Sequence, residues 1–143
     1  ITTAALINAL DISKKKIDKV KIVVNGAGAS AMACANLFKK TGVPQKNITM
    51  VDRTGVIYRG RDSLNQWKSS HANETKDRTL DDAITNADVF LGLSAKGALT
   101  KDMVKKGAVV IDVGFSKEDK KIYGDCDFNA LNHHVSAISP APV

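Results

Sequence analysis

The segment Lys21–Gly42, KIVVNGAGASAMACANLFKKTG, constrains the fold more than any other stretch of this chain. It begins with a short apolar run, Lys21–Asn25, passes through glycine, alanine and serine, and continues directly into a helical pattern over Ala29–Lys40. A strand that enters a helix within so few residues must turn tightly, and small residues permit such a turn. The segment therefore predicts a buried strand, a tight turn and a helix that ends near Gly42 and Pro44.

The same alternation of apolar strands and helices continues along the rest of the chain. Further strands are expected over Asn47–Val51, Asp88–Leu93, Ala108–Val113 and part of His133–Ser139. Further helices are expected over Ile1–Leu10, Leu64–His71, Leu80–Ala87 with a cap at Thr79 or Asp81, and Leu99–Gly107 with a cap at Thr100. Such alternation is typical of a parallel sheet covered on both faces, with right-handed crossovers. The sequence therefore predicts an α/β fold, a Rossmann-like doubly wound parallel sheet with three layers, α/β/α.

The composition fits a single domain of this kind. The chain has 143 residues, and its net charge of +6 comes mostly from lysines in short runs at expected turns and helix ends. Aromatic residues are only 5% of the chain, so we expect a solvated surface and no nucleic-acid interface. No apolar run approaches ~20 residues, and the N-terminal segment lacks the basic start of a secretory leader. We therefore expect no membrane contact and a cytoplasmic protein.

The turn after the first strand matches the Gly-x-Gly-x-x-Ala form of the dinucleotide-binding fingerprint at Gly26, Gly28 and Ala31. In this fingerprint the first glycine permits the turn, the second lets a pyrophosphate approach the backbone, and the alanine lets helix and strand pack closely. The amides of Ala29 and Ser30 would open the helix, where the partial positive charge favours phosphate. Because a strand precedes the match and a helix follows it, we expect these residues to bind a dinucleotide cofactor.

Asp52 follows the second expected strand at the position where such proteins place an acid, about 20 residues after the fingerprint. That acid would accept hydrogen bonds from the ribose hydroxyls of an adenosine. Its negative charge favours NAD, because it would repel the 2′-phosphate of NADP. An arginine at this place could instead hold the phosphate with two hydrogen bonds. Arg53 follows directly, and Arg59 and Arg61 lie further along, although all three could simply be solvated. The sequence leaves the choice between NAD and NADP open.

Side chains that could carry acid–base, nucleophilic or metal chemistry form no useful pattern. They are His71, His133, His134, Cys34, the pair Asp81 and Asp82, and the pair Asp125 and Asp127. We expect the histidines to be exposed or locally hydrogen-bonded, the cysteine to belong to the core, and the acidic pairs to cap helices or form turns. The sequence therefore predicts no catalytic residue and no metal site.

From Ile1 to about Lys105 the chain resembles the nicotinamide-binding domain of bacterial malic enzyme. The resemblance is carried by KVKIVVNGAGASAMACANLF, NITMVDRTGVIYRGR, LNQWKSSHA and DVFLGLSAKGALTKDMVK. Malic enzymes oxidatively decarboxylate malate to pyruvate with NAD or NADP and a divalent metal. The resemblance implies a pyrophosphate site at Gly26, Gly28, Ala29, Ser30 and Ala31, an adenosine-ribose site at Asp52 and Arg53, and a crevice lined by Ser94 and Ala95.

From Gly107 to Val143 the chain instead resembles the end of the cofactor domain of methylenetetrahydrofolate dehydrogenase/cyclohydrolase. The matching segment is GAVVIDVGFSKEDKKIYGDCDFNALNHHVSAISPAPV. In that family VIDVG forms a cofactor-lining strand and loop, which implies Val113 and Gly114 as cofactor-binding residues, and GDCDF precedes a helix. A malic enzyme would continue here into an apolar strand and an Ala-Asn-Pro-like turn, and this chain departs from that pattern.

The resemblance changes near Met103–Gly107, although both families use a cofactor domain of the same doubly wound kind. An engineered fusion of two related half-domains would explain the change, and so would an unusual natural family member. Either origin predicts one NAD(P)-binding Rossmann-like domain over residues 1–143. Its malic-enzyme-like part is 1–105, and its methylenetetrahydrofolate-dehydrogenase-like part is 106–143.

The resemblances imply that the catalytic tyrosine, lysine and acidic metal ligands of malic enzyme, and the catalytic lysine of the folate family, lie outside the matching segments. We therefore expect the chain to bind NAD or NADP without catalysing a reaction alone. One alternative is a chimeric or designed scaffold with weak or no cofactor binding, because crevice loops from two parents need not match. The other is a fragment that uses its cofactor as methylenetetrahydrofolate dehydrogenase does. An apolar patch left by an absent partner domain would favour a homodimer.

Overall fold

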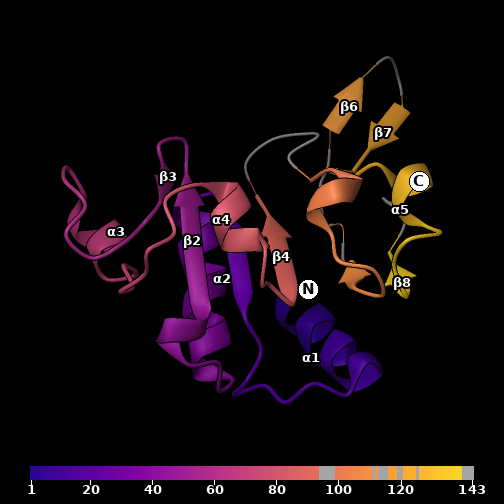
Figure 1. The fold of residues 1–143 in the computed structure, drawn as a ribbon, viewed down its shortest axis with the longest axis horizontal. Coiled ribbons are helices and arrows are strands. Elements are labelled where there is room, and N and C mark those ends of the chain that lie inside the picture. Colours follow the sequence, from indigo (N-terminus) through magenta and orange to yellow (C-terminus); the bar gives the residue numbers. More distant parts are fainter. Residues whose placement is uncertain (94–98, 111, 113–115, 119–120, 125, 140–143) are drawn as a thin grey trace.

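The structure, a computed structural model, describes residues 1–93, 99–110, 112, 116–118, 121–124 and 126–139 (Figure 1). The α-helices are α1 (Thr2–Ser13), α2 (Ala29–Lys40), α3 (Gln66–Ser69), α4 (Leu80–Ile84) and α5 (Phe128–Leu131), and the short 3₁₀ helices are η1 (Gln45–Asn47) and η2 (Lys101–Met103). The strands are β1 (Ile22–Asn25), β2 (Ile48–Asp52), β3 (Gly55–Val56), β4 (Val89–Gly92), β5 (Val109–Val110), β6 (Ser116–Glu118), β7 (Lys121–Tyr123) and β8 (Ala137–Ile138).

The central sheet has the strand order β3-β2-β1-β4. β1 runs parallel to both of its neighbours, with Ile22 opposite Ile48 of β2 and Val89 of β4, whereas β3 is antiparallel to β2. All of β1 is buried, as expected for an apolar strand covered on both faces. Parallel strands joined through the crossover helix α2 confirm the predicted Rossmann-like fold.

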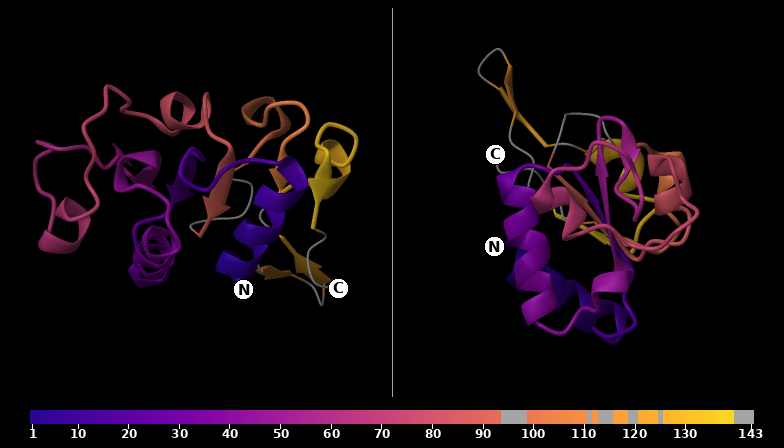
Figure 2. Two further views of the ribbon diagram at one scale, coloured as in Figure 1. Left: turned by 90° about the horizontal axis from the view of Figure 1, so that it is seen from below. Right: turned by 90° about the vertical axis from the view of Figure 1, so that its left-hand side faces the viewer.

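Helices cover both faces of this sheet, so the predicted α/β/α layering is also confirmed. Val24 of β1 shares one core cluster with Leu6 of α1 and Phe38 of α2. The adjacent Val23, which points to the other face, shares a second cluster with Ala83 of α4. Figure 2 shows α1 and α2 on one side of the sheet and α4 on the other.

Most predicted elements of the first half of the chain are present, although α3 and α4 are shorter than the helices expected over Leu64–His71 and Leu80–Ala87. The helix after the glycine turn spans Ala29–Lys40, as predicted, and the N-terminal helix extends beyond Leu10 to Ser13. Thr79, and not Asp81, caps α4. Its Oγ1 accepts a hydrogen bond from the Asp82 amide at 3.2 Å, and the Asp82 carboxylate accepts one from the Thr79 amide at 2.9 Å.

The prediction of a helix over Leu99–Gly107 is wrong. Only the single turn η2 forms, Thr100 makes no side-chain cap, and Val104 is already extended, with φ −105° and ψ 121°. Just beyond it, Lys105 donates a hydrogen bond to Asp88 at 2.8 Å. A long-range ion pair and the packing of Met103 and Val104 against an apolar cluster therefore override the local helical pattern.

The strands after η2 also differ from the prediction. Among described residues, the strand expected over Ala108–Val113 contains only β5, which pairs in parallel with β8 in a separate two-stranded sheet. The hairpin of β6 and β7 was not predicted. The helix expected after GDCDF is present as α5, which Asp127 caps through the Ala130 amide at 3.1 Å. In the described part of the chain, no helix is long and apolar enough to span a bilayer.

Candidate functional site

The turn between β1 and α2 separates two glycines with different surroundings. Gly26 has φ +128°, and a Cβ built there would lie 3.3 Å from the backbone carbonyl carbon and oxygen of Leu93. Its amide donates to the Val51 carbonyl oxygen at 2.8 Å. Gly28, the N-cap of α2, has an ordinary extended backbone, and a Cβ there would meet no described atom within 4 Å. Packing within the chain therefore explains Gly26, whereas the space above Gly28 is open to a ligand.

The first turn of α2 offers its backbone amides at this opening. Ala29 and Ser30 are exposed, and the first turn carries no acidic residue. The first amides of a helix lack intrahelical acceptors and carry a partial positive charge, which attracts anions. Ala31 is 1% exposed and belongs to the core cluster that joins α2 to β1. The structure thus places the fingerprint residues where the sequence expected them, and whether they bind a pyrophosphate stays a prediction.

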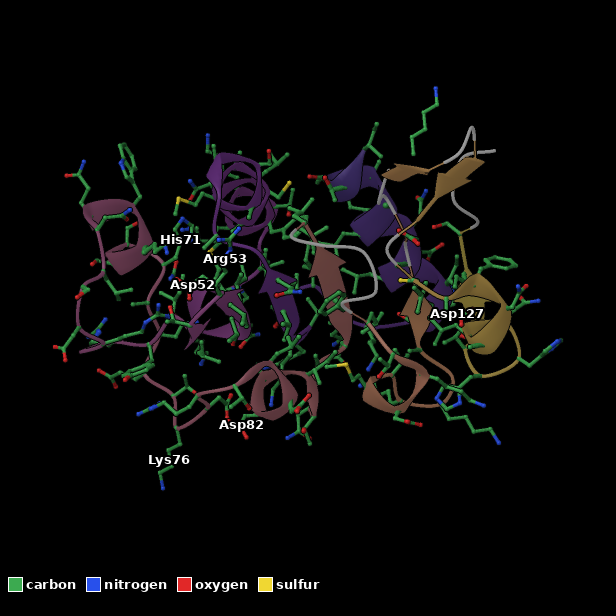
Figure 3. All side chains as sticks on the ribbon, turned by 90° about the horizontal axis from the view of Figure 1, so that it is seen from above. Asp52, Arg53, His71, Lys76, Asp82 and Asp127 are labelled. Atoms are coloured by element: carbon green, nitrogen blue, oxygen red, sulfur yellow. The ribbon has the colours of Figure 1, made fainter. Side chains whose placement is uncertain are left out.

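An open cavity of about 520 Å³ lies at the carboxyl ends of β1 and β2. It is lined by Asn25, Gly26, Ala27, Gly28, Val51, Asp52, Arg53, Thr54, Lys68 and Leu93. In open parallel sheets, ligands bind outside the carboxyl ends of the strands. The cavity joins the glycine turn to the end of β2 and is large enough for part of a dinucleotide. Figure 3 shows Asp52 and Arg53 side by side at this edge.

The Asp52 carboxylate is already surrounded by donors. Its Oδ1 accepts hydrogen bonds from the amide and hydroxyl of Thr54 at 3.0 and 2.9 Å. Arg61 Nη2 lies 2.9 Å from both carboxylate oxygens, and Lys68 Nζ lies 2.6 Å from Oδ2. Burial alone would raise the pKa of Asp52, but the hydrogen bonds from Lys68, Arg61 and Thr54 outweigh it and hold the pKa far below its usual range.

This arrangement changes the interpretation of Asp52. Two carboxylate oxygens offer about four lone-pair positions, and contacts from Thr54, Arg61 and Lys68 already occupy them. A ribose hydroxyl would therefore have to displace one of these donors. With Arg53 exposed beside them, the cationic side chains outnumber the single carboxylate at this edge.

The remaining sequence-predicted residues fall into different places. The Arg59 side chain is 72% exposed, and its Nη1 lies 3.2 Å from Glu74 Oε1. Arg59 is therefore solvated, which is one of the two alternatives that the sequence leaves open for it. Lys68 was not among the residues predicted from the sequence, because no local pattern connects α3 with the end of β2. The predicted crevice residues Ser94, Ala95, Val113 and Gly114 lie outside the described residues, as does Asp125.

His71 corrects another expectation, because it is buried and its side chain makes no hydrogen bond to another described residue. It is 3% exposed, and burial, with a smaller contribution from the charge of Lys39, lowers its pKa. His133 is exposed, as expected, whereas His134 is half-buried and contacts through Nε2 the carbonyl oxygen of Val104, 30 positions earlier in the chain. Cys34 is partly buried against the main core cluster. No group of metal-ligating side chains occurs among the described residues.

Comparison with known proteins finds similarity to two kinds of enzyme. The family profile described as the NAD(P)-binding domain of tetrahydrofolate dehydrogenase/cyclohydrolase matches residues 28–143. An NADP-dependent malic enzyme of Rhizobium meliloti is 50% identical over 124 residues, which are 85% of this chain and 16% of that protein. An NAD-dependent malic enzyme of the same organism is 44% identical over 109 residues, 76% of this chain and 14% of that protein. The chain thus spans only a small part of these relatives.

Solved structures show the same two relationships. The NAD-dependent malic enzyme of Thermotoga maritima superposes with a TM-score of 0.78 at 26% identity, covering 96% of this chain and 37% of that one. The methylenetetrahydrofolate dehydrogenase-cyclohydrolase of Trypanosoma brucei, solved with NADP and an inhibitor, has a TM-score of 0.62 at 22% identity. It covers 99% of this chain and 43% of that one, and at this identity it shows the fold alone.

Proposed function

This chain belongs to the family of NAD(P)-binding domains of tetrahydrofolate dehydrogenase/cyclohydrolase, and we propose that it binds NADP in preference to NAD. Its relatives include both NADP-dependent and NAD-dependent malic enzymes, so kinship alone does not choose between the cofactors. The choice rests on the side chains at the end of β2. The observation that carries it is that every acceptor position of Asp52 already has a donor within the chain.

The pyrophosphate would lie against the glycine turn. The open space above Gly28, the exposed first turn of α2 and the cavity of about 520 Å³ support this placement. Ala29 and Ser30 would donate their amides to the phosphate oxygens, while Ala31 keeps the helix close to β1. The residues present therefore fit the cofactor at this end.

The adenosine ribose would lie at Asp52. A 2′-hydroxyl gains little there, because it must compete with Thr54, Arg61 and Lys68 for the carboxylate. A 2′-phosphate instead supplies acceptor oxygens to Lys68, which Asp52 holds, and to the exposed Arg53. The lowered pKa of Asp52 keeps its carboxylate ionised even in mildly acidic solution, so Lys68 and Arg61 stay anchored well below neutral pH. These charges therefore favour NADP.

The reaction that this domain serves belongs to a larger oxidoreductase. The bound nicotinamide would accept or donate a hydride, and the relatives point to oxidative decarboxylation of malate, with folate-type dehydrogenation as the alternative. The chain would supply the cofactor half of the active site, residues 1–143 acting as one domain. Substrate and metal groups would come from other polypeptide, so this chain alone would not catalyse the reaction. We also propose that the chain forms a homodimer, is cytoplasmic, and contacts neither nucleic acid nor a membrane.

Replacement of Lys68 tests the proposed preference. Lys68→Ala removes the cation offered to the 2′-phosphate, and a charge-assisted hydrogen bond is worth about 1.5–3 kcal/mol. Calorimetric titration should therefore show NADP affinity falling roughly tenfold or more. NAD affinity should stay unchanged or rise, because Lys68 no longer competes with the ribose hydroxyl for Asp52. Lys76→Ala is the matched control, because Lys76 is exposed and Figure 3 shows it projecting outward, away from Asp52. Equal losses for both cofactors in Lys68→Ala would contradict the proposal.

A further inference from the structure

Arg61 lies behind the ribose end of the candidate site, where a second cation could be taken for a phosphate ligand. We propose that Arg61 is instead a positioning residue, which sets the preference between NADP and NAD by holding Asp52 and Lys68 without contacting the cofactor. This inference rests on the proposed function and concerns the same site. It assigns Arg61 a role different from that of Arg53, its exposed neighbour at the cavity.

Both terminal nitrogens of the Arg61 guanidinium are occupied by contacts within the chain. Nη1 donates to the carbonyl oxygens of Gly55 at 3.2 Å and Val56 at 2.9 Å. Nη2 lies 2.9 Å from both oxygens of Asp52 and 2.6 Å from the hydroxyl of Thr54. The terminal nitrogens carry two N–H groups each, so these acceptors leave neither nitrogen a free donor.

The position of Arg61 agrees with such an internal role. Its side chain is only 15% exposed, and it is not among the residues that line the cavity in the described part of the chain. Its two terminal nitrogens connect the end of β2 with the backbone of β3, which closes the turn between these strands. A planar fork can satisfy acceptors on both sides at once, which a lysine ammonium cannot do with the same geometry.

The influence of Arg61 on the cofactor would pass through Asp52 to Lys68. Lys68 Nζ lies 2.6 Å from the same carboxylate, and its side chain is 27% exposed and lines the cavity. Its helix, α3, is a single turn capped by Asn65, so Asp52 is the anchor that fixes the ammonium. When Arg61 is lost, a carboxylate lone pair becomes available to the 2′-hydroxyl of NAD, and the Asp52 carboxylate that anchors Lys68 is held less firmly. Both effects move the preference from NADP toward NAD.

A double-mutant cycle separates positioning from direct contact. The ratio of NADP to NAD affinity would be measured by calorimetry for the wild-type chain, Arg61→Ala, Asp52→Asn and the double variant. We expect Arg61→Ala to lower the ratio about tenfold or more, and to change it less than about twofold once Asp52 is already Asn. Arg61→Lys should also lower the ratio, because it keeps the charge but not the fork. Arg59→Ala, the exposed arginine control, should leave the ratio unchanged.

The remaining outcomes of these titrations show whether the role of Arg61 or the proposed function is wrong. If Arg61→Ala lowers the ratio equally in the Asp52→Asn background, Arg61 contacts the phosphate itself and the inference is overturned. If Arg61→Lys retains the wild-type ratio, charge alone suffices and the inference is again overturned. Thermal melting checks that each variant folds, and Arg61→Lys still tests the role of the fork if Arg61→Ala does not fold. Should the wild-type chain bind neither cofactor, the proposed function fails, whereas an unchanged ratio with tight wild-type binding defeats only the role of Arg61.

Discussion

The two glycines of the turn should respond differently to the same added methyl group. Gly28 has φ −85° and ψ 180°, which alanine adopts easily, and its Cβ would meet no described atom within 4 Å. Glycine is the better N-cap by about 1 kcal/mol, but alanine restricts the unfolded chain by about 0.4–1 kcal/mol in its favour. The free energy of unfolding of Gly28→Ala should therefore stay within about 1 kcal/mol of wild type.

Cofactor binding should nevertheless be lost. The methyl group would stand where the pyrophosphate approaches the amides of α2, and each charge-assisted hydrogen bond lost costs about 1.5–3 kcal/mol. NADP affinity should fall at least about tenfold in Gly28→Ala. Gly26→Ala provides the contrast: with φ +128° and a Cβ 3.3 Å from Leu93 backbone atoms, it should lose stability, by about 1–3 kcal/mol.

Urea unfolding and calorimetric titration of both variants measure these two quantities separately. We expect Gly28→Ala to fold like the wild-type chain and to bind NADP poorly. If Gly28→Ala bound NADP with wild-type affinity, the space above Gly28 would not be the pyrophosphate site. If it unfolded as readily as Gly26→Ala, the structure of the turn itself would be in error.

Three further predictions concern stability. Although burial would raise it, hydrogen bonds from Lys105, Lys15 and a backbone amide lower the pKa of Asp88 to about 2 from its ordinary 3.8. The stability contributed by this carboxylate should be complete above the ordinary pKa and lost as pH falls toward 2. Urea unfolding of Asp88→Asn should accordingly show a weaker acid dependence than wild type, and an identical pH profile would exclude these contacts. Thr79→Ala removes the cap of α4 and should cost about 1 kcal/mol in thermal unfolding without altering NADP affinity; no loss would mean that the cap does not form in solution. Leu6 is 2% exposed, so Leu6→Ala should cost about 2–5 kcal/mol, and a cost near zero would mean that α1 does not pack on the sheet.

The sequence predicted the part of the fold that depends on local signals. The apolar run before Gly26, the small residues of the turn and the helical pattern over Ala29–Lys40 all act within one continuous segment, and the structure places them as expected. The helix predicted over Leu99–Gly107 failed because its last residues are held by distant partners. The ion pair between Lys105 and Asp88 joins positions that no periodicity relates.

The sequence predicted the backbone features of the candidate site, but not which charged side chains surround Asp52. The fingerprint and Asp52 follow from sequence pattern, because glycine and a strand-ending acid serve local geometry. The cations around that acid do not, since Arg61 and Lys68 reach it from beyond the β2–β3 turn and from α3. His71 is likewise expected from the sequence to be exposed or locally hydrogen-bonded, because its polar neighbours give no sign that it is buried.

The two resemblances meet in one continuous fold. The malic enzyme of Thermotoga maritima covers 96% of the chain, and the folate family profile covers residues 28–143, so each relationship crosses the segment Met103–Gly107. Two parents with the same doubly wound domain could be joined there without changing the architecture. The origin of the chain as a fusion or as an unusual natural member stays a prediction.

Isothermal calorimetry of the wild-type chain, titrated with NADP and separately with NAD, is the decisive experiment for the proposed cofactor site. We expect saturable binding of both at one site, with NADP about tenfold or more tighter, and a preference that weakens as added salt screens the cations around Asp52. A cooperatively folded chain that gives no heat of binding with either cofactor at millimolar concentration would contradict the proposal. The chain would then be a dinucleotide-binding fold without a working site.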